Sequence, residues 1–149
     1  MNITAFGINH TTAPVQMRER AVIADDRLHD AVRDLTGHSQ IEEATILSTC
    51  NRTEIYCGHT LDDDSCIVDW LSDFQKLPQG DLNPFTYTHQ NKDAVNHTFR
   101  VASGLDSMIL GEPQILGQMK KAFSHANQAG ATGKILNRLF HHLKFSPVY

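Results

Sequence analysis

The sequence predicts an α+β domain, built as a ferredoxin-like βαββαβ antiparallel sandwich followed by C-terminal helices. Three observations lead to this prediction. A length of 149 residues, with 40% apolar and 20% charged residues, suits one soluble globular domain. Stretches with the two-residue period of strands alternate with amphipathic helical stretches in the order βαββαβ. Helical periodicity then continues beyond the last of these strands.

The first half of the chain predicts a strand, a helix and a hairpin. ITAFGIN at residues 3–9 alternates as a first strand does. Asp25 and Asp26 can cap a helix that ends at Gly37, with its apolar stripe at Leu28, Ala31, Val32 and Leu35. ATILST (44–49) predicts a buried strand and EIYCGH (54–59) its hairpin partner, with residues 50–53 as the turn.

The remaining elements follow in the same way. The acidic cluster at 62–64 opens a second helix, whose inner face carries Ile67, Trp70, Leu71 and Phe74. Pro78 and Gly80 stop this helix, and FTYTH (85–89) adds the last strand. A third helix carries Ala94, Val95, Thr98, Phe99 and Ala102. Pro113 suits the first position of a fourth helix, which ends at Gly130 and buries Ile115, Leu116, Met119, Ala122, Phe123 and Ala126. We therefore expect an α+β core over about 1–104 and a helical part over about 112–146.

Several classes of protein are disfavoured by the composition. The three cysteines are odd in number and form no CxxC pair, which favours a reducing compartment over a disulfide framework or a zinc knuckle. No signal peptide and no apolar run of membrane-spanning length are visible. Motifs for zinc hydrolysis, a dinucleotide or a P-loop are also missing, so we expect no metal. The chain is expected to be cytoplasmic.

Charge is distributed unevenly along the chain. Residues 1–112 contain 17 acidic and 8 basic residues, a net charge of −9. Residues 113–149 contain no acidic residue and five basic ones, namely Lys120, Lys121, Lys134, Arg138 and Lys144. Such a segment is a candidate for contact with a polyanion or with an acidic neighbouring domain, although a solvated helix face would have the same composition.

The stretch STCNRTEIY (48–56) places a cysteine in polar surroundings directly after a buried strand. It can be an ordinary polar turn, or it can present a thiol for chemistry at the tip of a rigid mount. A cation such as Arg52 can lower the pKa of a nearby thiol, or can bind an anionic substrate. Cys57 on a strand and Cys66 on a helix are interpreted as structural. His97, isolated on a helix, is ambiguous alone.

Three blocks of sequence resemble the glutamyl-tRNA reductase family. They are GINHTTAP (7–14) with RER (18–20), LSTCNRTEIY (47–56) and HTFRVASGLDSMILGEPQILGQMKKAF (97–123). They occur in one collinear series, and the resemblance runs from residue 1 to about 146. The chain is thereby identified as a member of this family, over its N-terminal catalytic domain.

The resemblance implies an activity, a cofactor and partners. Enzymes of this family reduce glutamyl-tRNA(Glu) with NADPH to glutamate-1-semialdehyde, the first step of 5-aminolevulinate and tetrapyrrole synthesis. They are homodimers with an NADPH-binding Rossmann domain and a helical dimerisation domain, neither of which is in this chain. Product can pass to glutamate-1-semialdehyde aminomutase. We therefore expect this chain alone to perform acyl transfer and hydrolysis only.

The resemblance also assigns site residues. The cysteine that matches Cys50 attacks the ester to form a thioester, and His97 matches a histidine important for activity, as base or as acid. Arg52 suits the substrate carboxylate and Glu112 the α-ammonium group. The remaining substrate contacts implied by the resemblance are Thr49, Asn51, Ser107, Pro113, Gln114 and Gln118.

Two features of the chain leave alternatives open. SPVY (146–149) does not resemble the family, whose basic helix should continue there. The ferredoxin-like order is also that of RRM modules, so a small RNA-binding module without catalysis is the alternative. An RRM, however, reads bases with strand aromatics, and here Tyr56 stands nearly alone. A plain thiol hydrolase that acts on simple esters is a further alternative.

Overall fold

A four-stranded antiparallel sheet forms the middle layer of the protein, and its strands lie in the order β2-β3-β1-β4. The computed structural model describes residues 1–107 and 114–144. The strands are β1 (Asn2–Asn9), β2 (Ile41–Ser48), β3 (Arg52–His59) and β4 (Tyr87–Gln90). β1 and β3 are the central pair, so the C-terminal end of β1 lies beside the N-terminal end of β3.

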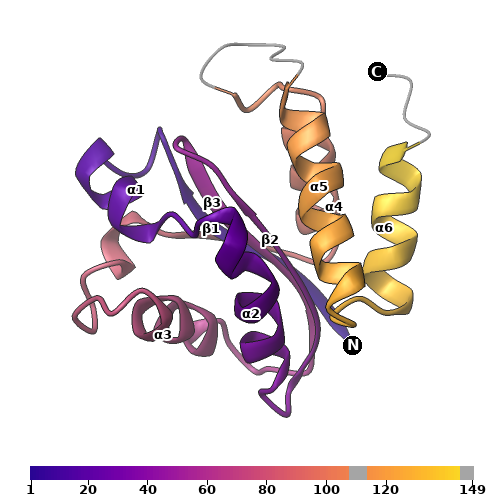
Figure 1. Ribbon diagram of the computed structural model, residues 1–149, viewed down its shortest axis with the longest axis horizontal. Helices are drawn as coiled ribbons and strands as arrows, with labels where there is room; N and C mark the ends of the chain where they lie inside the picture. The colour runs from indigo at the N-terminus through magenta and orange to yellow at the C-terminus, as the bar shows by residue number, and fades with distance from the viewer. Residues whose placement is uncertain (108–113, 145–149) are drawn as a thin grey trace.

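Helices cover both faces of this sheet (Figure 1). On one face lie α1 (Val15–Ala21), α2 (Asp25–Thr36) and α3 (Ser65–Phe74). On the other lie α4 (Lys92–Ala102), α5 (Gln114–Gln128) and α6 (Lys134–Lys144). Ile55 and Cys57 of β3 point into the first core, and Tyr56 points into the second. Both cores remove apolar surface from water and hold the sheet from its two sides.

The α+β class and the four-stranded antiparallel sheet are confirmed. β1 starts one residue before the predicted strand, and α2 covers the predicted helix and ends before Gly37. The predicted apolar stripes are buried or partly buried in the two cores. Asp25 and Asp26, however, lie inside the first turn of α2, where they favour the helix through its dipole. They do not cap it, because Ala24 is the N-cap residue and forms no side-chain cap bond.

Some boundaries differ from the prediction. β2 starts at Ile41, three residues before the predicted strand, and ends at Ser48, one residue before its predicted end. β3 starts two residues early, at Arg52, so the turn comprises residues 49–51 instead of 50–53. α3 begins at Ser65, after the acidic cluster, and ends at Phe74, before Pro78. Residues 83–85 form a 3₁₀ turn, so β4 starts at Tyr87. The predicted first position of the fourth helix, Pro113, lies outside the described residues.

Two helices were not predicted as separate elements. α1 has only seven residues and a largely polar sequence, VQMRERA, which gives a weak helical pattern. α6 is held at its N-terminus by a side chain that is distant in sequence. The buried Glu43 of β2 accepts hydrogen bonds from the backbone N–H groups of Gly133, Ile135 and Leu136 at 2.7, 3.2 and 2.8 Å. These bonds satisfy N–H groups that a helix N-terminus otherwise leaves unpaired.

The coverage of both faces bears on the RNA-binding alternative. A module of the RRM type needs an open sheet face from which aromatic side chains reach the bases. Here every residue of β3 is buried, and Tyr56 is 1% exposed beneath α4–α6. The strand aromatic therefore belongs to a core. In the described ranges, no helix combines the length and apolar character that a membrane crossing requires.

Candidate active site

The β2–β3 turn presents Cys50 at the surface. The Thr49 backbone N–H donates to the Arg52 carbonyl at 2.7 Å, and its Oγ1 accepts from the N–H groups of Asn51 and Arg52, both at 3.2 Å. These bonds close the turn on itself, while the Cys50 side chain remains exposed. The predicted position of Cys50, in a polar turn directly after a buried strand, is confirmed.

The other two cysteines lie in different surroundings. Cys57 is completely buried in the core, and burial, followed by the nearby Cys66, raises the pKa of its thiol. Cys66 is partly buried on α3, and its pKa is raised by burial and by Asp69 and Asp63. A raised pKa keeps a thiol protonated and unreactive. Both observations support the structural role predicted for these two residues.

A cavity of about 270 Å³ opens beside Cys50, and we call it the thiol pocket. Its wall includes Thr49 and Cys50 from the turn and Gln118 from α5. At its far side Lys121 of α5 donates a hydrogen bond to Asp25 of α2 at 2.8 Å. The pocket therefore combines a thiol, an amide and an opposite-charge pair.

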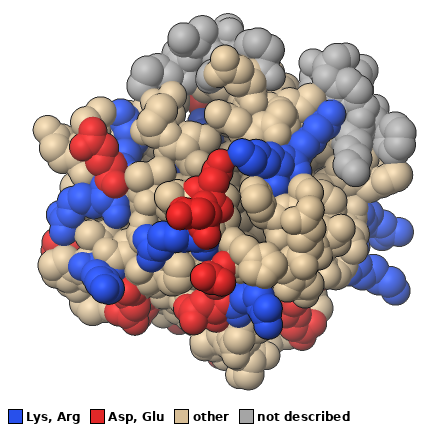
Figure 2. All heavy atoms as spheres, viewed as in Figure 1, with Lys and Arg blue, Asp and Glu red and all other residues tan. Residues whose placement is uncertain are grey.

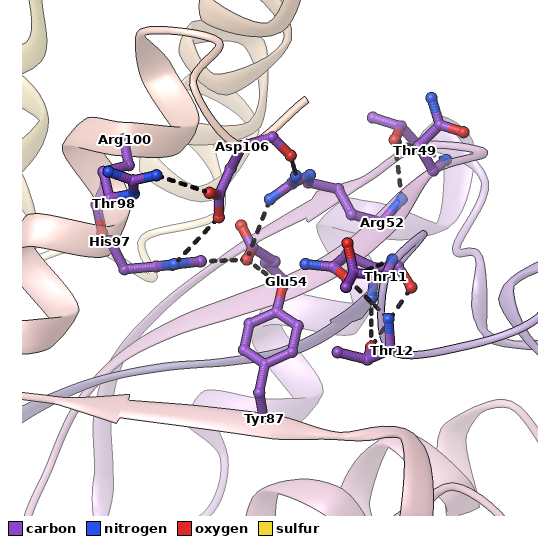
Figure 3. A network of polar contacts seen from close by, with 12 residues as sticks. Thr11, Thr12, Thr49, Arg52, Glu54, Tyr87, His97, Thr98, Arg100 and Asp106 are labelled. Carbon is purple, nitrogen blue, oxygen red and sulfur yellow. Dashed lines mark hydrogen bonds and ion pairs between the residues drawn. The ribbon is translucent and has the colours of Figure 1, made fainter. Parts of the chain in front are cut away.

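A buried carboxylate, Glu54, forms the centre of a second group of polar side chains (Figure 3). Its Oε2 lies 2.5 Å from His97 Nε2 and also accepts a hydrogen bond from the Tyr87 hydroxyl. Its Oε1 accepts from the Tyr56 hydroxyl at 2.5 Å, and Arg52 Nη1 lies 3.4 Å from Oε2. Two strands, β3 and β4, and the helix α4 thus contribute to one network.

The strand partner of Glu54 explains why the carboxylate fits there. Gly7 pairs with Glu54 across β1 and β3. A Cβ atom at Gly7 would lie 2.5 Å from the Thr53 carbonyl oxygen and 2.9 Å from Glu54 Cγ. A real Cβ cannot approach so closely, so only glycine leaves the space that the Glu54 side chain occupies.

The charges in this network stabilise one another. Burial by itself raises the pKa of Glu54, but the hydrogen bond and charge of His97, with Arg52 and Tyr56, outweigh burial and hold the pKa at about 2. Burial and the Glu54 charge raise the pKa of Tyr56 and of Tyr87. Burial lowers the pKa of Arg52, but Glu54 and Tyr87 outweigh it and raise the pKa. The group is thus an ionised carboxylate beside a guanidinium, with both tyrosines as neutral donors.

His97 lies between two carboxylates. Its Nε2 is bonded to Glu54, and its Nδ1 lies 3.7 Å from Asp106 Oδ2. Asp106 also interacts with Arg100 through its side chain, and its carbonyl oxygen accepts from Arg52 Nη2 at 2.6 Å. Neither ring nitrogen of His97 therefore contacts Cys50 in this structure. The histidine is positioned with Arg52 and Glu54, at the same end of the sheet as the thiol.

A second cavity, of about 420 Å³, opens beside His97 and Asp106, and we call it the His97 pocket. Its lining residues come from the end of β1, from β4, from α4 and from the segment after α4. They are Asn9, His10, Thr11, Thr12, Tyr87, His89, His97, Leu105, Asp106 and Ser107. Glu54 is not part of this lining, but it contacts two of the lining residues, His97 and Tyr87.

The predicted site residues divide between these places. Thr49, Cys50 and Gln118 line the thiol pocket, whereas His97 and Ser107 line the His97 pocket. Arg52 is 2% exposed and is in the lining of neither pocket. Asn51 completes the turn, and Gln114 is exposed at the start of α5. Glu112 and Pro113 lie outside the described residues.

Sequence reasoning missed Glu54, Tyr87 and Asp106. One pattern could have indicated Glu54, because residues two apart on a strand share a face and Arg52 precedes it by two. A buried acid beside a buried base is then the expected pairing. Tyr87 and Asp106 carry no comparable pattern, since only the tertiary structure brings them to Glu54 and Arg52. Within residues 1–107 and 114–144, no three His, Cys, Asp or Glu side chains gather as a metal ion would require.

Comparison with known proteins gives a consistent result. The sequence model of the family described as "Glutamyl-tRNAGlu reductase, N-terminal domain" matches residues 6–145. The chain is 52% identical over 140 residues to glutamyl-tRNA reductase from Nitrosomonas europaea, covering 94% of this chain and 33% of that protein. It is also 52% identical over 141 residues to the enzyme of that name from Methylococcus capsulatus, covering 95% and 34%.

A solved structure agrees with these sequence matches. Glutamyl-tRNA reductase from Methanopyrus kandleri superposes with a TM-score of 0.79 at 32% identity, covering 95% of this chain and 32% of that one. The chain thus spans about a third of the length of the relatives that it matches.

Proposed function

The chain belongs to the glutamyl-tRNA reductase family, as a member of its N-terminal domain group, and from that premise we propose that it accepts the glutamyl group of glutamyl-tRNA(Glu) on Cys50. In the longer enzyme this acyl transfer would precede an NADPH-dependent reduction to glutamate-1-semialdehyde, at the entry to tetrapyrrole synthesis. The proposal rests chiefly on the exposed Cys50 thiol, held by a closed turn at the mouth of the thiol pocket.

The proposed step is an exchange of an oxygen ester for a thioester. The Cys50 sulfur attacks the ester carbonyl carbon, a carbon–sulfur bond forms and the bond to the ribose oxygen breaks. The thiol proton ends on the released ribose hydroxyl, so atoms and charge balance. A thioester accepts hydride more readily than a free carboxylate, which makes one difficult reduction into two easier steps.

Recognition of the glutamyl group needs one cation and one anion, because the group carries a carboxylate and an α-ammonium. Arg52 is the proposed partner of the carboxylate, and its Nη1 forms no hydrogen bond within the described residues. Glu112 is the proposed partner of the ammonium group. Thr49, Asn51, Ser107 and the residues Pro113, Gln114 and Gln118 complete the proposed contacts.

His97 is proposed to transfer the proton between sulfur and ribose. Glu54 and Asp106 face its two nitrogens and orient the ring. A ring held in this way would stabilise a positive charge as it takes the proton. In this proposal His97 acts either as the base that takes the thiol proton or as the acid that protonates the ribose oxygen. A rearrangement on substrate binding would bring the ring to the thiol.

The cofactor and the protein partners belong to the rest of the longer enzyme. Within the described residues, no glycine-rich strand-to-helix turn offers a dinucleotide cradle, and Gly80, Gly104 and Gly130 are left-handed positions elsewhere. NADPH therefore does not fit the residues described here, and we derive no step through it. Homodimerisation and transfer of product to glutamate-1-semialdehyde aminomutase remain predictions, as does the cytoplasmic location.

The finer description of the fold is also proposed. The strand order β2-β3-β1-β4, with all neighbours antiparallel, supports a ferredoxin-like core over about 1–104. The helical part, about 112–146, would then be an addition that covers the second face of the sheet.

The decisive experiment is incubation of the chain with glutamyl-tRNA labelled in its glutamyl group. We expect label to become bound to the protein through a hydroxylamine-sensitive bond and to be released slowly as free glutamate. The Cys50→Ser variant should form no such adduct. The matched control is Cys66→Ser, on a partly buried helix position, which should transfer label almost as the parent does.

Two results would contradict the proposal. An adduct of normal yield in Cys50→Ser would show that another residue is the nucleophile. Turnover of simple esters at the same efficiency as glutamyl-tRNA would indicate a plain thiol hydrolase instead. Addition of NADPH should change neither the adduct nor the released product, because the hydride step requires the remainder of the enzyme.

A further inference from the structure

The turn that carries Cys50 joins the last paired residues of β2 and β3. Ser48 pairs with Thr53 at this end of the ladder, and their hydroxyl oxygens are hydrogen-bonded at 2.9 Å. Residues two apart on a strand share a face, so both hydroxyl groups lie on the same side of the sheet as Ile46 and Ile55, which belong to the first core. The pair therefore closes the hairpin directly before the turn, on the face that α1, α2 and α3 cover.

Ser48 also connects this end of the hairpin to the segment between α1 and α2. Its Oγ accepts a hydrogen bond from the backbone N–H of Ile23 at 2.8 Å. Ile23 is 1% exposed, and a buried N–H group that loses its partner is unfavourable. One hydroxyl group thus joins three parts of the chain, namely the end of β2, the start of β3 and the segment between the two helices.

The segment between α1 and α2 has further contacts that hold it in place. Gln75, at the end of α3, donates from Nε2 to the carbonyl oxygens of Ala21 and Val22 at 3.1 and 2.6 Å. Its Oε1 accepts a hydrogen bond from Arg27 Nη1 at 2.9 Å, so a residue of α2 orients the amide. Ser48 is therefore bonded to a segment that two other helices hold, and not to a free loop.

The opposite face of the hairpin end is held by a separate set of contacts. Arg52, at the start of β3, shares with Glu54 and Tyr56 the face that α4, α5 and α6 cover. Its Nη2 donates to the Asp106 carbonyl oxygen at 2.6 Å, and its Nη1 lies 3.4 Å from Glu54 Oε2. The turn is thus fixed on one face by a charged network and on the other face by two hydroxyl groups.

We propose that Ser48 is a positioning residue for the acyl transfer. Its two hydrogen bonds fix the Cys50 turn against the core, so that the thiol reaches the ester carbonyl in one defined geometry. Ser48 forms no bond to the substrate and acts only through the turn. A misplacement of about 1 Å in a reacting group can lower a rate roughly 100-fold, so the rigidity of this turn affects the reaction. The inference deepens the proposed function and rests on it, because it takes Cys50 to be the nucleophile.

The rigidity of the turn can be measured without substrate. A nitroxide spin label is attached to the exposed Cys50 in a Cys66→Ser background, in which the remaining cysteine, Cys57, is buried. In Ser48→Ala we expect the electron paramagnetic resonance spectrum to show label rotation at least about 2-fold faster than in the parent, because loops released from their contacts move on the nanosecond scale. Thr53→Val, which removes the other hydroxyl group at equal shape, should act in the same direction. Ser48→Thr, which keeps the hydroxyl group, should restore the parent spectrum.

Label transfer from glutamyl-tRNA measures the consequence for the reaction. In Ser48→Ala, with Cys50 unmodified, we expect the rate constant of transfer at saturating substrate to fall by about 10-fold to 100-fold. The half-saturating concentration should change by less than about 3-fold, because the substrate contacts remain. Ser48→Thr should recover the rate constant. A purely structural role would lower the folded fraction of the protein and would leave the rate constant of the folded protein unchanged.

The matched control is Thr4→Val, which also removes a buried hydroxyl group from a strand. Thr4 Oγ1 is hydrogen-bonded to His59 Nε2 at 2.6 Å, towards the other end of β1 from the site. Both Thr4→Val and Thr53→Val should lower the stability to urea, but only Thr53→Val should free the spin label and slow the transfer.

Two results would overturn the positioning role of Ser48. They are a label in Ser48→Ala that is as immobile as in the parent, and transfer at the parent rate in that variant. Absence of transfer in the parent would contradict the proposed function and this role with it. Transfer in the parent that Ser48→Ala leaves unchanged would contradict the role of Ser48 alone.

Discussion

At the scale of single residues, Glu54 decides the character of the site. It is fully buried and ionised, and it is surrounded by His97, Arg52 and two tyrosine hydroxyls. An isolated carboxylate in such a place would be strongly unfavourable, so the carboxylate and the guanidinium are each acceptable only because of the other. Glu54 also holds the His97 ring through the contact of its Oε2 with Nε2. Arg52, paired with Glu54, donates from Nη2 to the Asp106 carbonyl oxygen.

Replacing Glu54 with glutamine should destabilise the protein strongly. The variant leaves Arg52 buried without a carboxylate, which typically costs about 3–5 kcal/mol in the free energy of unfolding. Urea unfolding at neutral pH measures this loss. Glu19→Gln, on an exposed position of α1, is the matched control and should lie within roughly 0.5 kcal/mol of the parent.

The pH dependence of stability provides a second readout of the same pairing. The folded pKa of Glu54, about 2, lies below the ordinary value of 4.5, so its contribution is complete above about pH 4.5. It is lost as the pH falls from there towards 2, and it amounts to roughly 3 kcal/mol. The Glu54→Gln variant should lack this part of the acid-induced loss. An equal loss in both proteins would show that Glu54 is not ionised in the folded state.

Arg52 should not be replaceable by lysine. Its Nη2 donates to the Asp106 carbonyl oxygen while Nη1 faces Glu54, and one ammonium group cannot reproduce this planar fork. We expect Arg52→Lys to lower kcat/KM for transfer from glutamyl-tRNA by a factor that corresponds to about 1–3 kcal/mol. Arg100→Lys, at an exposed contact of Asp106, is the control. Full activity of Arg52→Lys would remove Arg52 from the substrate site.

At the scale of elements, the strand register places the chemistry. β1 ends at Asn9 beside Arg52, and β4 begins at Tyr87 beside Gly7, so three strands meet at one end of the sheet. Gly7 lies between Glu54 and Tyr87 on its two neighbours and leaves room for the Glu54 side chain. Glycine at position 7 of β1 therefore allows the Glu54 carboxylate to pack against the sheet.

Two glycine-to-alanine substitutions should therefore have opposite effects. Gly7→Ala places a methyl group 2.5 Å from the Thr53 carbonyl oxygen, and we expect a loss of roughly 1–3 kcal/mol in unfolding free energy. Gly117→Ala, inside α5, meets nothing within 4 Å and should stabilise the protein by about 0.5–1 kcal/mol. Chemical denaturation of both variants tests this contrast. Equal effects would show that the close approach at Gly7 can relax.

At the scale of the whole molecule, the uneven distribution of charge along the sequence corresponds to one side of the surface. Acidic and basic side chains are mixed over most of the face in Figure 2, whereas basic ones stand alone at the right-hand edge, where Figure 1 places α6. Lys121 is already paired with Asp25. Lys134 and Arg138, both exposed on α6, form no ion pair within the described residues. They are the better candidates for contact with RNA phosphates.

Removal of these two charges should reduce the salt dependence of tRNA binding. If each neutralises one phosphate, the slope of log K against log salt should become less steep by about 1.4–1.8 in the double variant Lys134→Gln, Arg138→Gln. The control is Arg33→Gln with Lys92→Gln, which alters two exposed basic residues elsewhere. An unchanged slope would show that these two side chains do not contact RNA phosphates.

The parts of the fold that are local in sequence were predictable. Strand and helix periods depend on neighbouring residues, and so β1, α2 and the predicted helical stripes matched the structure. The polar turn around Cys50 was also visible, because turn residues and strand residues differ in type. Boundaries failed where pairing with a distant strand extended an element, as at Thr53, or where a distant side chain held a helix, as Glu43 does for α6.

The sequence by itself determined the α+β class, the exposed position of Cys50 and, through its collinear motifs, the family. Each of these depends on residue types at short spacing along the chain. Only the tertiary structure decided that Glu54 joins His97 to Arg52, and that His10 and His89 share a pocket with His97. Glu54, His89 and His97 lie on β3, β4 and α4, and His10 follows β1. Strand pairing and the packing of α4 on the sheet bring them together, and neither leaves a pattern in the local sequence.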